Sequence, residues 1–392
     1  MQAWRSPAGE EELVAWLRAR APGERAPLIT GATERAETVD AELRECGRDV
    51  VSTGGAEWRE IVSYEPAELV VTVRAGLRIG ELRRRLASEG QWLPQADAAP
   101  DASVGGWVSV ARPTAWDPAF GRIRRQVLAC RVAGFDGKLL RWGRAVVKNV
   151  AGYDVLSLLC GGHGRLGILT RVTLRVWPKP PVSRRFTLQG GRDMWGALWK
   201  LLDTAPEEWP RPDALGWDWR ADQGTPRAWV RLVGSETSVD ARLRRLFRWA
   251  ESCSLQVAEM IGPVPARTDA APTRSRSLSE VVLRISTPIR RLPEKVEAAR
   301  RALGDTAVDL EAFPLAGMIR CTYRRSWSDA PADRRIAGLL EGLGEAAVAI
   351  ERGGPVEHAA AEARRPDALR KLEARVAEAL AGTARPWLAD YL

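Results

Sequence analysis

Residues 145–176 read AVVKNVAGYDVLSLLCGGHGRLGILTRVTLRV, and this stretch decides the fold of the first half of the chain. Tyr153 and the apolar residues up to Leu159 recur at helical spacing, so we predict a short amphipathic helix. Glycines follow at once and end the helix, as a helix C-terminus requires. The β-branched and leucine residues of 168–176 then predict a strand that stops before Pro178.

The turn between this helix and strand, residues 161–167, holds four glycines in seven positions. Glycine adopts positive φ without steric cost, so the backbone can direct several N–H groups to one side and form an anion-binding nest. A tight connection that happens to be rich in glycine explains the same pattern, because a glycine-rich turn alone is weak evidence. Two interpretations therefore stay open, a phosphate site and a structural corner.

Other elements of the first half follow from apolar periodicity. The segment RQVLACRVAGFDGKLLRW, residues 125–142, predicts a β-hairpin whose two-residue turn is Asp136 and Gly137. The remaining expected elements are a helix at 11–20, short strands at 27–30 and 49–53, a strand at 68–76 and a helix at 77–88.

A proline cluster at 178–181 marks a change of character, after which strand and helix patterns alternate. Helices that return to one antiparallel sheet give an α+β domain. We therefore predict an α+β protein with a two-lobed first domain over 1–180, a cap domain with an antiparallel sheet over 181–355, and a C-terminal helix over 356–392 that returns to the first domain.

Composition excludes several classes of protein. The chain has 392 residues, a formal charge of +9, five cysteines and two histidines. No C-x-x-C pair occurs, so this chain alone is not expected to hold an iron–sulfur cluster or an ordinary zinc site. Arginine is dispersed, without a basic run interleaved with aromatics, which argues against nucleic-acid binding. Because no stretch of about twenty apolar residues and no signal-peptide core occur, we expect a cytoplasmic protein.

The sequence around the glycine turn resembles a known family. KNVAGYD before the helix and LGILTRVTLRVWPKP after the turn are similar to the FAD-binding PCMH-type domain of the vanillyl-alcohol oxidase superfamily, and within it to the E subunit of bacterial glycolate oxidase. The likeness runs from about Ile61 to Pro180 and includes IVSYEPAELVVTVRAGLRIGELRRRLASEGQWLP and ASVGGWVSV. It implies a two-lobed FAD-binding domain followed by a cap.

The resemblance also implies which residues hold the cofactor. In the family, the backbone of the ASVGGWVSV loop and of the later glycine turn lies against the pyrophosphate and ribityl chain of FAD, and an N-terminal phosphate loop corresponds to LITGATERAETV. The matching positions are Gly31, Ala32, Thr33, Ser103, Val104, Gly105, Gly106, Lys148, Asn149, Gly152, Tyr153, Gly161, Gly162, His163, Gly164, Gly167 and Ile168. We expect the bends at Gly105 and Gly162 to converge on one dinucleotide.

Three departures from the family pattern concern chemistry. Glu34 stands where a diphosphate comes close, which costs energy unless a cation such as Arg35 offsets its charge. ARPTAWDPAFGRIRR lacks the family's further glycines and paired arginines, although Arg112 and residues 122–125 supply cations. The last residues, LAGTARPWLADYL, lack the segment that usually closes this fold. A degenerate flavin site is therefore an open alternative.

His358 is the candidate catalytic residue, because related 2-hydroxyacid dehydrogenases use histidines, a bound metal and an arginine near the flavin. A single histidine in a segment of small residues is also typical of a surface or capping position. We predict no metal site in this chain.

The resemblance implies the FAD-binding subunit of a glycolate oxidase-like complex. Such a complex oxidises a small 2-hydroxy acid and passes electrons to flavoprotein and iron–sulfur partner subunits. Any peripheral association with the inner face of the membrane is expected to arise through those partners. Two alternatives remain: a noncatalytic scaffold subunit of the same fold with a degenerate flavin site, and a free-standing FAD-linked oxidase of another small molecule.

Overall fold

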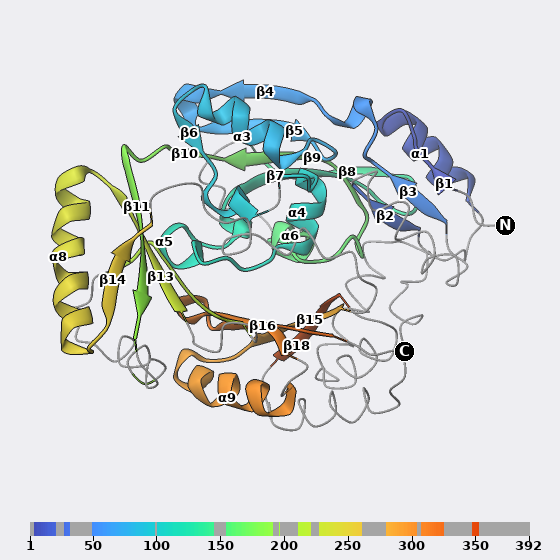
Figure 1. The fold of residues 1–392 in the computed structure, drawn as a ribbon. Helices are drawn as coiled ribbons and strands as arrows, with labels where there is room; N and C mark the ends of the chain where they lie inside the picture. Colours follow the sequence, from blue (N-terminus) through green and yellow to red (C-terminus); the bar gives the residue numbers. More distant parts are fainter. Residues whose placement is uncertain are drawn as a thin grey trace. The chain divides into compact units, whose positions relative to one another are not determined.

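A computed structural model describes residues 4–20, 27–31, 49–98, 100–144, 154–190, 196, 211–220, 227–260, 280–303, 307–324 and 347–352. These residues form two compact units, whose elements are drawn in Figure 1. The first unit comprises Met1–Arg112 and Gly121–Lys179, and the second comprises Pro113–Phe120 and the described residues from Pro180 to Arg352. The helix predicted at 356–392 lies outside the described residues.

Within the described residues, the smaller lobe of the first unit contains a three-stranded parallel sheet and a helix. In spatial order its strands are β1 (Trp4–Arg5), β3 (Val50–Ser52) and β2 (Leu28–Thr30). Helix α1 (Glu10–Ala19) buries Leu13 and Leu17, which are spaced four residues apart on one face. The helix and the two short strands predicted in this region are confirmed.

The larger lobe is a five-stranded antiparallel sheet covered by short helices. In spatial order its strands are β4 (Ile61–Glu65), β5 (Val70–Arg74), β9 (Ile168–Arg175), β7 (Val127–Ala133) and β8 (Leu139–Gly143). The helices are α3 (Ile79–Ala87), α4 (Val104–Val110) and α6 (Val155–Leu159). A further two-stranded pair joins β6 (Gln91–Trp92) to β10 (Trp177–Pro178). Strands β7 and β8 form the predicted hairpin, with Gly137 at φ 72° in its turn.

A buried carboxylate joins the two lobes of the first unit. Glu10, at the start of α1, forms ion pairs with Arg131 of β7 at 3.0 Å and with Arg171 of β9 at 3.2 Å. These arginines are directly opposite each other in the sheet, where two like charges destabilise a strand pair. The shared carboxylate offsets that repulsion and ties α1 to the larger sheet.

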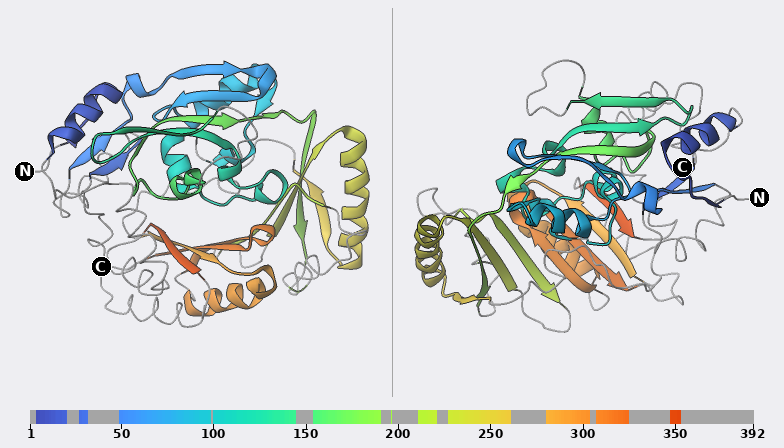
Figure 2. Two further views of the ribbon diagram at one scale, coloured as in Figure 1. Left: turned by 180° about the vertical axis from the view of Figure 1, so that it is seen from behind. Right: turned by 90° about the horizontal axis from the view of Figure 1, so that it is seen from above.

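The second unit is built on an antiparallel sheet of eight strands within the described residues. Their spatial order is β14 (Gln256–Glu259), β11 (Val182–Gln189), β13 (Arg227–Gly234), β12 (Ala214–Arg220), β16 (Ala307–Phe313), β17 (Met318–Arg324), β15 (Glu280–Ser286) and β18 (Ala347–Arg352). Helices α8 (Glu236–Ser252) and α9 (Leu292–Leu303) lie on the sheet, α8 near β11, β13 and β14 and α9 near β16 and β17, as Figure 2 shows from two further directions. The predicted α+β fold is confirmed.

The two faces of this second sheet differ in chemistry. Ile319 and Cys321 of β17 pack into one hydrophobic core with Leu292 and Val296 of α9. Because side chains alternate along a strand, Arg320 between them points to the opposite face. The helices therefore cover an apolar face, and Arg320 lies on the opposite face.

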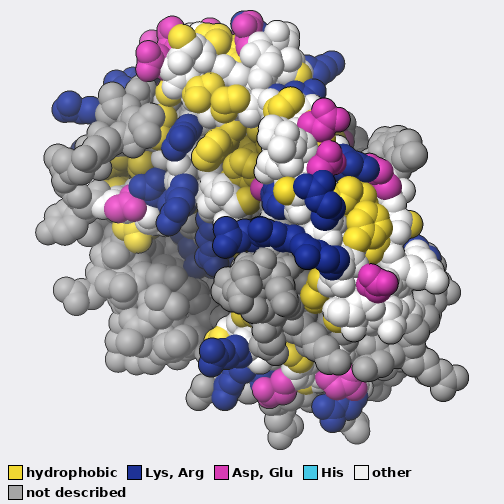
Figure 3. Space-filling view, turned by 90° about the vertical axis from the view of Figure 1, so that its left-hand side faces the viewer, with side chains coloured by type: hydrophobic (Ala, Val, Ile, Leu, Met, Phe, Trp, Pro, Cys, Tyr) yellow, Lys and Arg dark blue, Asp and Glu magenta, His cyan; other side chains and the backbone are white. Residues whose placement is uncertain are grey.

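Arginine is spread along the sequence, yet Lys and Arg side chains lie together in a band on one face of the molecule (Figure 3). In the described part of the chain, none of the helices combines the length and apolar character needed to cross a bilayer.

Candidate functional site

The first segment of the candidate site is the start of α4. Ser103 caps this helix, and its Oγ accepts the N–H of Gly106 at 3.1 Å. The N–H of Gly105 donates to the carbonyl of Ala75 at 2.7 Å, and a Cβ at Gly105 would lie 2.8 Å from the Cβ of Ala75. Glycine at position 105 therefore allows α4 to lie directly against the end of β5.

The second segment is the turn of residues 161–167, which follows α6 as predicted. Gly161 has φ 85°, Gly164 has φ 77° and Gly167 has φ 134°, so the expected positive φ values are confirmed. His163 shares this left-handed conformation at φ 51°, although a side chain disfavours it. The turn therefore holds one strained residue among its glycines.

Two backbone hydrogen bonds join this turn to α4. The N–H of Gly161 donates to the carbonyl of Val108 at 3.2 Å, and the N–H of His163 donates to the carbonyl of Ser109 at 2.9 Å. Residues about 55 positions apart in the sequence thus lie side by side, and the convergence of the bends at Gly105 and Gly162 on one dinucleotide stays a prediction.

The third segment is the end of β2, where Gly31 lies against the start of α4 and Ile29 lies against the 161–167 turn. A Cβ at Gly31 would overlap the Oγ of Ser103, so only glycine lets this chain approach the start of α4 so closely. On the other side, a Cβ at Gly164 would lie 2.9 Å from Cδ1 of Ile29. Three glycine-bearing segments therefore meet at one place in the first unit.

Most amides of the turn are already bonded within the protein. Besides the two bonds to α4, the N–H groups of Gly162, Arg165 and Gly167 donate to carbonyls of the turn or of α6, at 3.2, 2.9 and 3.4 Å. Among the described residues, the amides of Gly164 and Leu166 make no such bond. The turn is thus chiefly a structural corner, and its free anion-binding capacity is smaller than its glycine content predicts.

Room for a ligand lies beside two of the glycines. A Cβ at Gly161 would have the Cβ of Ala111, at 3.7 Å, as its one neighbour within 4 Å in the described structure. A Cβ at Gly106 would meet the Oγ of Ser103, at 3.0 Å, and nothing else within that range among the described residues. Among the described residues, the backbone at Gly106 and Gly161 is therefore the least crowded part of the three segments, and its contact with FAD stays a prediction.

The remaining predicted site residues fall into two groups. Val104 and Ile168 are fully buried in the cores of the first unit, so a ligand can reach only their backbone. The others lie outside the described residues: Ala32, Thr33, Lys148, Asn149, Gly152, Tyr153 and the candidate catalytic His358.

A polar cluster anchors the chain just before α6. Asp154 caps the helix and accepts hydrogen bonds from the N–H of Ser157 at 3.3 Å and from its hydroxyl at 2.5 Å. Arg124 donates to Asp154, to Ser157 Oγ at 3.0 Å and to the carbonyl of Val127 at 3.0 Å. Burial acts to raise the pKa of Asp154, but the hydrogen bonds from Ser157 and Arg124 outweigh it, so the pKa lies below its usual value.

Sequence reasoning missed a row of charges on the second sheet. On the face that points away from α9, Arg320 of β17 is directly opposite both Glu311 of β16 and Arg284 of β15, and it forms an ion pair with Glu311 at 3.1 Å. Arg320 is 8% exposed. The signal was available, because in MIRCTYRR the arginine alternates with the core residues Ile319 and Cys321.

A comparison with protein families defines the class. Residues 3–143 match the model of the FAD binding domain. This match agrees with the predicted resemblance for that part of the chain, and the 161–167 turn lies beyond it.

The chain is also similar to individual proteins that are named as oxidase subunits or dehydrogenases. The chain is 34% identical over 185 residues to glycolate oxidase subunit GlcE of Escherichia coli (strain K12), which covers 47% of this chain and 50% of that protein. It is 30% identical over 136 residues to a D-lactate dehydrogenase of Anaerostipes hadrus, with 33% and 29% covered, and 27% identical over 168 residues to glycolate oxidase subunit GlcD of Bacillus subtilis (strain 168), with 41% and 34% covered. The chain thus spans half of these relatives or less.

The fold also has a counterpart among solved structures. Alkyldihydroxyacetonephosphate synthase superposes with a TM-score of 0.67 over 97% of this chain and 76% of that one, at 12% sequence identity. At this identity the likeness concerns the fold alone.

Proposed function

We propose that this chain is the FAD-binding subunit of a glycolate oxidase-like complex that oxidises a small 2-hydroxy acid and passes the electrons to an iron–sulfur partner. The observation that carries the proposal is the meeting of three glycine-bearing segments in the first unit. Two of them, the one that ends at Gly31 and the Ser103–Gly106 segment, lie within the residues 3–143 that match the FAD binding domain. The relatives GlcE and GlcD, which are named as subunits of glycolate oxidase, support the assignment to a complex.

Bound FAD supplies a two-electron acceptor for the hydride that leaves C2 of the acid. The residues of this chain hold and orient that cofactor. Ser103 fixes the first turn of α4, and the carbonyls of Val108 and Ser109 hold the glycine turn beside it. Gly106 and Gly161 keep the adjoining backbone open.

The test is to purify the chain together with its natural neighbours, record the visible absorbance spectrum, and determine flavin and iron content. Flavin in this chain, iron in a partner and dye reduction by a 2-hydroxy acid support the proposal. A correctly folded but colourless chain overturns it in favour of the scaffold alternative, which the internally bonded amides of the 161–167 turn support. Turnover by the isolated chain with oxygen as acceptor points instead to a free-standing oxidase.

A further inference from the structure

Four arginines form a line across the larger sheet of the first unit. In the strand pairing, Arg74 of β5 is directly opposite Arg171 of β9, Arg171 is directly opposite Arg131 of β7, and Arg131 is directly opposite Arg141 of β8. Like charges that are directly opposite destabilise a strand pair. This arginine row therefore depends on carboxylates that lie against it.

Two carboxylates lie against the arginine row, and they differ in burial. Glu60, just before β4, pairs with Arg74 at 2.7 Å, and its side chain is 56% exposed. Glu10 contacts both central arginines, with Oε2 at 3.0 Å from Nη1 of Arg131 and Oε1 at 3.2 Å from Nε of Arg171, and its side chain is 10% exposed. Water and salt screen a buried ion pair less than an exposed one, so the Glu10 carboxylate has the stronger effect on the row.

Glu10 differs from Glu60 also in the lobe from which it comes. It begins α1 of the smaller lobe, and α1 shares a hydrophobic core with β7 and β9 of the larger sheet. Apolar burial is non-directional, so polar contacts are needed to set the orientation of the helix. Glu10 supplies them at its start, and near its end Nε of Arg18 donates to the carbonyl of Gly137 at 3.1 Å.

The smaller lobe that Glu10 holds also carries the end of β2. There Ile29 lies against Gly164 of the 161–167 turn, and Gly31 lies against Ser103 at the start of α4. On the other side of the contact, Arg171 belongs to β9, the strand that begins directly after the turn. The Glu10 carboxylate thus joins the lobe that contains Gly31 to the strand that follows the glycine turn.

We propose that Glu10 is a positioning residue for the flavin site. Through Arg131 and Arg171 it holds the two lobes of the first unit at the spacing at which the three glycine-bearing segments meet. Without its charge, two arginines oppose each other with no shared carboxylate, and the smaller lobe loses its orientation on the larger sheet. The inference rests on the proposed function.

The first unit contains two matched controls. Glu60→Gln removes a carboxylate from the same arginine row but breaks no contact between the lobes. Val71→Ala lowers stability by creating a cavity, because Val71 of β5 is fully buried in the core of the larger lobe. Together they separate the tie between the lobes from the charge of the row and from a general loss of stability.

The experiment measures Kd for added FAD by flavin fluorescence and Tm of the apoprotein in the full chain. We expect Glu10→Gln to raise Kd for FAD by about tenfold. Glu60→Gln should leave Kd within about twofold of wild type, and so should Val71→Ala, although Val71→Ala lowers Tm. If Glu10→Gln does not fold, Glu10→Asp replaces it, because aspartate keeps the charge on a shorter side chain and should give a smaller rise in Kd.

Hydrogen exchange of the apoprotein gives a readout that needs no cofactor. The amides of Gly161 and His163 donate to carbonyls of α4, and they should exchange faster in Glu10→Gln than in Val71→Ala, since the turn loses its fixed neighbour in the smaller lobe. Exchange at the same rate in the two variants contradicts the positioning role.

A double variant tests whether Glu10 acts through Arg171. Glu10→Gln combined with Arg171→Gln should bind FAD no more weakly than Glu10→Gln alone, because both substitutions break one contact. Effects on Kd that multiply contradict the bridging role.

An unchanged Kd in Glu10→Gln, or an equal rise in Val71→Ala or Glu60→Gln, overturns the inference and leaves the proposed function standing. A wild-type chain that binds no FAD overturns both.

Discussion

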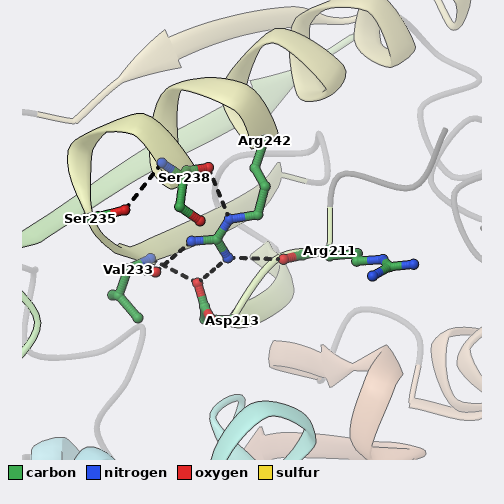
Figure 4. A network of polar contacts seen from close by, with 6 residues as sticks. All are labelled: Arg211, Asp213, Val233, Ser235, Ser238 and Arg242. Atoms are coloured by element: carbon green, nitrogen blue, oxygen red, sulfur yellow. Dashed lines mark hydrogen bonds and ion pairs between the residues drawn. The ribbon is translucent and has the colours of Figure 1, made fainter. Parts of the chain in front are cut away.

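Arg242 of α8 donates a hydrogen bond of 2.7 Å to the carboxylate of Asp213, and both side chains are largely buried (Figure 4). The same carboxylate accepts the N–H of Val233 at 2.7 Å. Arg242 also donates to the carbonyl oxygens of Val233 and Arg211, the latter at 3.2 Å. One ion pair therefore ties the first turns of α8 to the end of β13 and to the chain that enters β12.

Substituting Asp213 by Asn should destabilise the second unit. The change removes the charge that pairs with Arg242 in a poorly solvated place, so the free energy of unfolding should fall by about 2 to 4 kcal/mol. Urea denaturation followed by tryptophan fluorescence measures this loss. Arg301→Gln is the control, because its pair with Glu297 is exposed on α9 and should contribute less than about 0.5 kcal/mol. Similar losses in both variants would contradict the assignment.

Gly106→Ala should separate cofactor binding from stability. Alanine is favoured over glycine inside a helix, so the apoprotein should keep its free energy of unfolding within about 1 kcal/mol. The added methyl group occupies the room beside α4, and Kd for FAD should therefore rise by about tenfold. Gly9→Ala is the control, since a Cβ there meets no atom within 4 Å among the described residues. An unchanged Kd for FAD in Gly106→Ala would show that FAD does not bind beside residue 106.

The ion pair of Asp154 and Arg124 should make stability depend on pH. A pKa held below the unfolded value of about 3.9 means that the carboxylate stabilises the folded state above that pH and loses this effect as pH falls through the folded pKa. In Asp154→Asn the acid limb of the plot of unfolding free energy against pH should become shallower.

A double-mutant cycle with Arg124→Gln isolates the pair. The coupling between the two positions should be measurable near neutral pH and vanish once the pH has fallen through the folded pKa of Asp154, because the carboxyl is then protonated in both states. Coupling that persists in acid would show that the contact does not depend on the charge of Asp154.

Cys321 should resist alkylation in the native protein. The side chain is fully buried, and burial raises the pKa of its thiol to about 12. At about pH 8 almost no reactive thiolate forms. Iodoacetamide labelling followed by peptide mass spectrometry should therefore modify Cys321 only after unfolding, whereas the partly exposed Cys253 should react in the folded chain. Rapid native labelling of Cys321 would contradict its burial.

Local signals in the sequence predict the first unit well. The β7–β8 hairpin follows from Asp136 and Gly137 alone, and the succession of α6, turn and β9 follows from glycines set between apolar runs. Strand β11 gives only a weak apolar pattern, because Arg185 and Thr187 alternate with its core residues Phe186 and Leu188. Strand β14 is a four-residue edge strand that is mostly exposed. Its sequence therefore lacks the apolar alternation that predicts a half-buried strand.

The sequence predicts which segments form the candidate site but not the hydrogen bonds between them. Glycine content indicates which backbone can bend, and positive φ values are found where expected. Glycine content does not indicate which carbonyl groups accept hydrogen bonds from the N–H groups of the turn. The carbonyls of Val108 and Ser109 do so, and they belong to a segment that is distant in the sequence. The sequence likewise does not predict that Pro113–Phe120 belongs to the second unit, since a single buried tryptophan produces no periodic pattern.

Residues 113–120 belong to the second unit, and this limits where the gene can be divided to express the units separately. A fragment that ends near residue 180 would contain Trp116 without Arg231, and the indole would then be exposed to water. A cap transplanted from a related enzyme would inherit the same defect unless these eight residues were exchanged with it. A fragment that is to keep the second unit whole therefore needs residues 113–120 as well as those from Pro180 onward, although each unit has its own core.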